Sequence, residues 1–187
     1  ATAEGGQLLS RERDRWRVCL HEAGHAVACR HALGRPAAAV VVEGVCGLTY
    51  AKFHRGPTGI TFAVALMVAC GKAAEALTDR VDPPTEAPEL RPAVLPEAGE
   101  LSGHDAFVED FDTGQPDAEI VGHWVWGDCT SQAFADSRLA RLCDAAREFI
   151  GEHQAEVLEA ARGLYRFGVY LPWAEKGIEH DHDLDKN

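Results

Sequence analysis

The residues whose types and spacing are suited to chemistry lie in the pentapeptide H-E-A-G-H, which contains His21, Glu22 and His25. Residues four apart on an α-helix are separated by about 40° around the axis and about 6 Å along it. Two histidines at this spacing can present their imidazoles to one tetrahedral Zn²⁺ ion. Glu22, about 100° further round than His21, would reach past the metal and act on its bound water as general base and then general acid. The pentapeptide therefore predicts a hydrolytic site with one zinc ion.

The pentapeptide leaves the third protein ligand of such a zinc ion open. Catalytic zinc sites have three protein ligands and one open position. His31 lies six residues beyond His25, about 600° round the helix, and so faces away from the pair. The remaining candidates are several carboxylates and five other histidines, which are His54, His104, His123, His180 and His182.

A single amphipathic helix has to position these residues. Ser10 is suited to cap its beginning, and Gly34-Arg35-Pro36 is typical of its end. Gly24 in its middle costs about 1 kcal/mol relative to alanine. We expect this cost to be accepted because a residue without a side chain lets substrate or a neighbouring backbone approach the metal face.

The rest of the chain predicts a mainly α fold with a small β-hairpin (α+β). Residues 37–45 are β-branched enough for a strand, and residues 47–53 alternate as its hairpin partner. A second helix is expected from Thr58 or Thr61 to about Thr78. Apolar stripes predict further helices over 139–150 and 156–165, followed by a short last helix and a polar tail at 179–187. We interpret residues 1–187 as one domain.

An acidic, proline-rich segment interrupts this pattern at about residues 79–120. It contains twelve acidic residues, two arginines and six of the nine prolines, so it carries −10 of the net charge of −12. Long segments of this kind inside a domain are usually functional or disordered. We interpret the segment as an insertion, either a lid over the site or a partly disordered stretch that binds a basic protein partner.

Composition excludes two classes of partner. A net charge of −12 disfavours nucleic acid, whose binding depends on cationic contacts to phosphate, and it disfavours anionic membranes. No apolar run reaches the roughly 18–20 residues of a membrane span, and the first residues do not resemble a signal peptide.

The six cysteines include no C-x-x-C pair, which favours reduced thiols and a cytoplasmic location.

Three blocks of the sequence resemble the FtsH-type zinc metallopeptidases. H-E-A-G-H-A-V is similar to the active-site helix of that family, and Cys70–Leu77 resembles its Gly-Gly-Arg-x-Ala-Glu-Glu helix. Gly47, Leu48, Thr49 and Tyr50 resemble its Gly-Val-Thr-Phe strand. The resemblance implies a zincin-like active-site helix in a helical metallopeptidase domain, with this strand beside the substrate cleft.

The resemblance also bears on the third ligand, which in that family is an aspartate opening a later helix. Asp136, in A-D-S-R-L-A, fits this pattern, although Q-A-F-A-D replaces the usual glycine-serine-asparagine run. Asp128, in W-G-D-C-T-S, is a rival, and either aspartate could instead be an ordinary helix cap. Glu75 matches a family glutamate that orients the site. His123 is a separate candidate for stabilising an oxyanion.

The 187 residues contain neither the ATPase module nor the membrane helices of those proteases. We therefore expect an ATP-independent metallopeptidase acting on loose or short peptides. One alternative is a zinc-dependent tailoring enzyme for a small molecule or one specific peptide in a biosynthetic pathway, since fold does not fix chemistry. A second alternative is a non-catalytic adaptor that uses the acidic segment. The substrate and the oligomeric state have no signal in the sequence.

Overall fold

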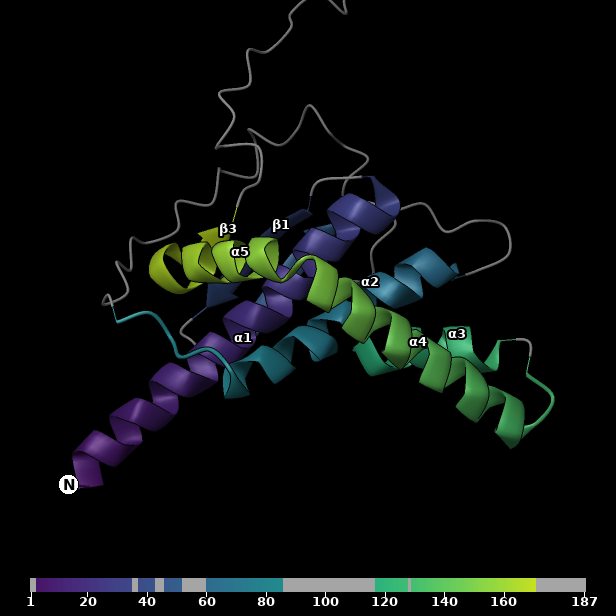
Figure 1. Ribbon diagram of the computed structural model, residues 1–187, viewed down its shortest axis with the longest axis horizontal. Helices are drawn as coiled ribbons and strands as arrows, with labels where there is room; N and C mark the ends of the chain where they lie inside the picture. Colours follow the sequence, from purple (N-terminus) through teal and green to yellow (C-terminus); the bar gives the residue numbers. More distant parts are fainter. Residues whose placement is uncertain are drawn as a thin grey trace, which may run out of the picture.

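The computed structural model describes residues 3–34, 37–42, 46–51, 60–85, 117–127 and 129–170 (Figure 1). Within these ranges the chain is mainly helical, with a small antiparallel sheet, which confirms the predicted fold class at this level. The helices are α1 (Ala3–Leu33), α2 (Phe62–Glu75), the 3-10 turn η1 (Ala76–Asp79), α3 (Asp117–Trp126), α4 (Gln132–Glu152) and α5 (Gln154–Phe167); the strands are β1 (Ala37–Val42), β2 (Cys46–Ala51) and β3 (Val169–Tyr170).

Helix α1 runs through the middle of the molecule, and both α2 and α5 pack across it (Figure 1). Its buried face contributes Trp16, Cys19, Leu20 and Val27 to the core. The close packing against α2 requires a glycine, because a Cβ at position 24 would lie 2.6 Å from the Cys70 carbonyl oxygen. The expected close approach of a neighbouring backbone to this helix is therefore present, and the neighbour is α2.

The small sheet covers another side of α1 and has the strand order β2-β1-β3. β1 and β2 form the predicted antiparallel hairpin, in which Val40 pairs with Leu48. Gly168 ends α5 in the left-handed conformation, with φ of 75°, as glycine commonly does after a helix. The Gly168 carbonyl then accepts a hydrogen bond of 2.8 Å from the amide of Val41. These contacts attach the end of α5 to the sheet.

Two predicted boundaries are wrong. Helix α1 begins at Ala3, so Ser10 lies inside the helix and does not cap it. The acidic segment was expected to extend to Ile120, but α3 begins at Asp117. At its other end, η1 continues α2 as far as Asp79. The predicted tail at 179–187 lies outside the described residues. A turn and a short last helix are predicted after the 156–165 helix. The described part of that stretch contains the strand β3 (Val169–Tyr170), and residues 171–178 lie outside the described residues.

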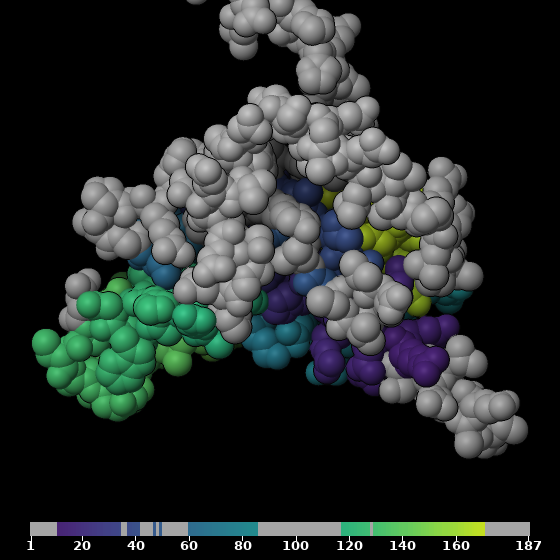
Figure 2. All heavy atoms as spheres, turned by 180° about the vertical axis from the view of Figure 1, so that it is seen from behind, coloured from purple at the N-terminus to yellow at the C-terminus, as the bar shows by residue number. Residues whose placement is uncertain are grey.

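Helices α3 and α4 form a projection at one end of the molecule. Figure 2, a view from behind, shows this projection (green) at one end and part of α1 (purple) at the other. Cys19, Cys29, Cys70, Cys129 and Cys143 are free thiols, as predicted for these five positions. Among the described residues, no helix has the length and apolar character needed to cross a membrane.

Candidate metal centre

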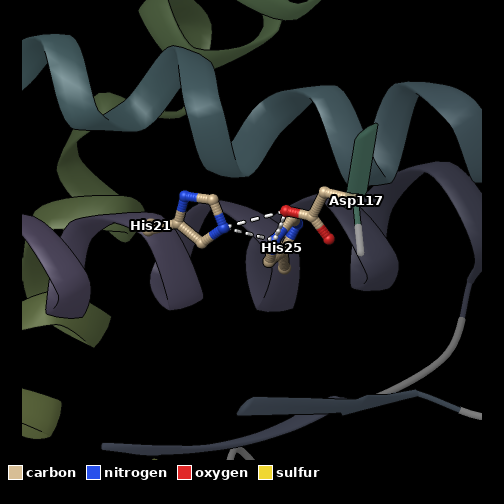
Figure 3. A group of neighbouring side chains, drawn as sticks. All are labelled: His21, His25 and Asp117. Carbon is tan, nitrogen blue, oxygen red and sulfur yellow. Dashed lines mark hydrogen bonds and ion pairs between the residues drawn. The ribbon is translucent and has the colours of Figure 1, made fainter. Parts of the chain in front are cut away.

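His21 and His25 face the carboxylate of Asp117 across the space between α1 and α2 (Figure 3). The Nε2 atoms of the two histidines lie 3.0 Å apart. The Oδ2 atom of Asp117 lies 2.9 Å from Nε2 of His21 and 3.1 Å from Nε2 of His25. These three atoms form a nearly equilateral triangle, which is the arrangement of three protein ligands around a tetrahedral metal.

The other ring nitrogen of each histidine is already bonded. Nδ1 of His21 lies 2.9 Å from Oε1 of Glu75, and Oε2 of Glu75 accepts a 2.8 Å bond from Lys72. Nδ1 of His25 donates to the carbonyl of Met67 at 3.0 Å. Carboxylate and carbonyl partners at this position fix the tautomer and orientation of metal-binding histidines. Glu75 therefore contacts the first histidine of the pair.

The protonation of the two histidine rings determines what the three atoms can bind. When both Nδ1 atoms carry protons, the two neutral imidazoles direct Nε2 lone pairs toward the carboxylate oxygen of Asp117. Three acceptors within 3.1 Å of one another have no donor among them, so the arrangement requires a proton or a metal cation at its centre. Two imidazoles and a carboxylate are a common ligand set for Zn²⁺.

The electrostatics also favour a cation. Burial alone would lower the pKa of His25, but the hydrogen bond and charge of Asp117 and the charge of Glu22 outweigh it and raise that pKa. Burial would raise the pKa of Asp117, but its contacts with the His21 and His25 rings, and any positive charge that these rings carry, hold that pKa well below its usual range. Both shifts stabilise the charged forms, so the site favours an ionised carboxylate beside a positive charge.

A glycine on α2 makes room for the buried ring of His25. A Cβ at position 71 would collide with Cε1 and Nε2 of the imidazole, the latter at 2.5 Å. His25 is only 6% exposed, so its ring cannot move into solvent to relieve that collision. Gly71 is therefore required for His25 to reach the centre.

Glu22 points from α1 toward β2. Its side chain is buried, and Oε2 accepts a 2.6 Å hydrogen bond from the hydroxyl of Thr49. The Thr49 hydroxyl also lies 3.2 Å from the backbone carbonyl of Glu22. A Cβ at position 47 would collide with the Glu22 carboxylate, so Gly47 and Thr49 together fix the position of that carboxylate.

A cavity of about 380 Å³ opens beside His21 and Glu22. Gly47 from β2 and Glu75 from α2 line it together with two cationic residues, Arg17 and Lys72. The predicted substrate strand therefore borders this cavity through Gly47. The side chains of Leu48 and Tyr50, predicted as further substrate contacts, lie outside the described residues.

The structure does not bring the predicted third ligand to the two histidines. Asp136 lies on the exposed side of α4, where its Oδ1 accepts a 2.8 Å hydrogen bond from Gln132. Among the described residues, the carboxylate grouped with His21 and His25 belongs to Asp117. The rival, Asp128, lies outside the described residues.

His123 also lies away from the centre, as an exposed residue of α3. Its side chain is 61% exposed, and Nε2 lies 3.6 Å from Oε1 of Glu119. The ring is paired with a carboxylate of its own helix, so the predicted oxyanion role has no support in this arrangement.

Asp117 was missed because it was assigned to the acidic insertion. A signal for it exists: Pro116 immediately precedes it, and proline is common at helix starts. Ile120, Val121, Trp124 and Val125 then recur at helical spacing. These residues form α3, which places Asp117 in its first turn against α2.

Comparison with known proteins gives no further guide to this centre. No family model, curated protein or solved structure matches the chain.

Proposed function

We propose that the chain is a zinc-dependent hydrolase, most simply an ATP-independent peptidase that cleaves amide bonds. The observation that carries the proposal is the triangle of Nε2 of His21, Nε2 of His25 and Oδ2 of Asp117, with edges of 2.9–3.1 Å. Glu22 directly follows the first of these residues and lines the same cavity as His21. The metal-ligand geometry and the candidate base thus occur together.

The chemistry divides between the metal and Glu22. A zinc ion held by these three residues would lower the pKa of a coordinated water and polarise a carbonyl. The Glu22 carboxylate, fixed by Thr49 at 2.6 Å, accepts a proton from the attacking water and returns it to the leaving amine. The buried position of Glu22 strengthens this role because water is excluded from one side of the carboxylate.

The sheet supports a peptide substrate. β2 is an edge strand in the order β2-β1-β3 among the described residues, and Gly47 and Thr49 on it contact Glu22. An extended peptide can pair with such an edge through main-chain hydrogen bonds. This pairing would lay the scissile bond beside the cavity.

The test is Glu22→Gln, assayed on a library of short peptides with the zinc-loaded protein. General acid–base catalysis contributes about 10²–10⁴-fold, so kcat should fall by that factor while zinc affinity stays unchanged. The matched control is Glu159→Gln, which changes an exposed glutamate of α5 and should retain wild-type activity. Full activity in Glu22→Gln would refute the assigned role, and failure of the wild type to bind zinc would refute the proposal as a whole.

The variant Thr49→Val tests whether the position of the Glu22 carboxylate matters for catalysis independently of metal binding. The variant removes the hydroxyl bonded to Glu22 but no ligand, so kcat should fall with unchanged zinc affinity.

A small-molecule substrate is the second candidate, favoured by the cavity itself. Its volume of about 380 Å³ lies within the range of small-ligand sites. Its wall carries Arg17 and Lys72 beside Glu22 and Glu75, so both signs of charge are present to orient a polar small molecule. Hydrolysis of N-acylated amino acids but not of internal peptide bonds would select this candidate over the peptidase.

A further inference from the structure

A second group of potential metal-ligand side chains lies at the C-terminal end of α1. His31 is in the last turn of α1, His153 is the single residue between α4 and α5, and Glu156 is in the first turn of α5. Nε2 of His31 lies 2.9 Å from Oε2 of Glu156, and Nδ1 of His153 lies 3.8 Å from Oε1 of Glu156. One ligand atom from each residue lies within 4.8 Å of the others.

These spacings fit a metal ion. Ligand atoms in a tetrahedral zinc site with bonds of 2.0–2.1 Å lie about 3.3–3.4 Å apart. The two histidines contact different oxygens of Glu156, at 2.9 Å and 3.8 Å, and one ligand atom from each residue lies within 4.8 Å of the others. Two imidazoles with one carboxylate suit zinc and the neighbouring borderline divalent metals. All three side chains are partly exposed, so they have room to rotate until the three ligand atoms reach the spacing of a metal site.

An aromatic residue holds the two imidazoles together. Their ring centroids lie 4.0 Å apart, with planes tilted by 32°. Phe149 packs against both rings, at 4.4 Å from His153 and 6.1 Å from His31. The two residues are therefore already neighbours, and one ring has to turn out of the stack before both in-plane nitrogen lone pairs can reach the same ion.

Arg30 is the group that competes with a metal here. Its Nη2 contacts Oε2 of Glu156, which His31 also contacts. The Arg30 side chain is 45% exposed, so the guanidinium can turn into solvent when a divalent cation takes its place. The carboxylate stays neutralised in either state.

We propose that His31, His153 and Glu156 form a second divalent metal site, separate from the His21–His25–Asp117 centre, that binds Zn²⁺ or a similar borderline cation. The site ties the end of α1 to the corner between α4 and α5. It does not depend on the proposed hydrolase function, because none of its residues belongs to that centre. Metal bound only by the folded chain raises its thermal stability.

The test uses a background from which the first centre has been removed, His21→Ala with His25→Ala. Isothermal titration with zinc should still find one equivalent, and zinc should raise the midpoint of thermal unfolding. Adding His31→Gln and His153→Gln to this background should abolish both effects. Adding His123→Gln instead, which changes an exposed histidine paired with one glutamate, should leave both unchanged.

The four histidines outside the described residues are controlled by carrying His54→Gln, His104→Gln, His180→Gln and His182→Gln throughout. A second measurement needs no variant of the cluster: in ¹⁵N-labelled protein, zinc should shift the ring-nitrogen signals of His31 and His153. Retention of the zinc equivalent in His31→Gln/His153→Gln, or unshifted ring signals at saturating zinc, would overturn the proposal.

Discussion

Replacing Asp117 with asparagine tests the metal centre most directly. The three ligand atoms form a triangle with edges of 2.9, 3.0 and 3.1 Å. Each atom has to move outward by only about 0.2 Å to reach the spacing of about 3.3–3.4 Å that tetrahedral zinc imposes. The triangle is therefore close to a binding geometry before any metal enters. Asparagine preserves its shape but removes the anionic oxygen.

The expected loss of zinc affinity in Asp117→Asn follows from the ligand that is lost and the two histidines that remain. Loss of a partner that merely orients a ligand costs about 10–100-fold in metal affinity. Loss of the charged ligand should exceed this, so zinc affinity should fall more than about 100-fold, or about 2.7 kcal/mol. His21 and His25 keep their contacts to Glu75 and Met67, so residual weak binding is expected.

The assay is competition for zinc against a chromophoric chelator near neutral pH, with circular dichroism to verify folding. The matched control is Asp136→Asn, the same change at the aspartate favoured by the sequence pattern, which should bind zinc as the wild type does. If Asp117→Asn binds zinc normally and Asp136→Asn does not, the assignment from the structure is wrong.

The remaining predictions concern packing and metal dependence. Gly71→Ala should weaken zinc binding at least tenfold, because the added Cβ collides with the ring of His25. The control Gly163→Ala, whose Cβ would meet no neighbouring element within 4 Å, should bind zinc normally. Arg15→Met should lower the free energy of unfolding by about 2 kcal/mol, measured with urea, because the buried guanidinium makes two hydrogen bonds to the Tyr165 carbonyl; an unchanged urea midpoint would contradict this. Chelation should abolish hydrolysis, and added zinc should restore it; activity that survives complete metal removal would exclude a metal-dependent reaction.

The local elements were predictable because short-range patterns determine them. The spacing of His21 and His25 needs only a helix, and α1 supplies one. The β-branched run at 37–42 pairs with 46–51 as a hairpin, and Thr61 caps α2 with its side chain. In each case the decisive residues lie within a few positions of one another.

The third ligand was not predictable in this way, because it depends on packing between distant helices. Asp136 fits a helix-start pattern, but α4 begins at its N-cap Ser131 and buries the side carrying Ala135, Leu142 and Ala146. Asp136 is about 100° from Ala135, which places it in solvent. Asp117 instead reaches the histidines because α3 packs on α2. No local pattern contains that contact.

The position of Asp117 in the chain has a consequence for the integrity of the centre. Asp117 lies 92 residues from His25. A cut anywhere between residues 86 and 116 would leave both histidines on one fragment and the carboxylate on the other. Metal would then act as a bridge between two molecules, and its apparent affinity would depend on fragment concentration. Mixing the two halves should reconstitute the centre by complementation, since α3 and α4 pack on α2 while α5 packs on α1.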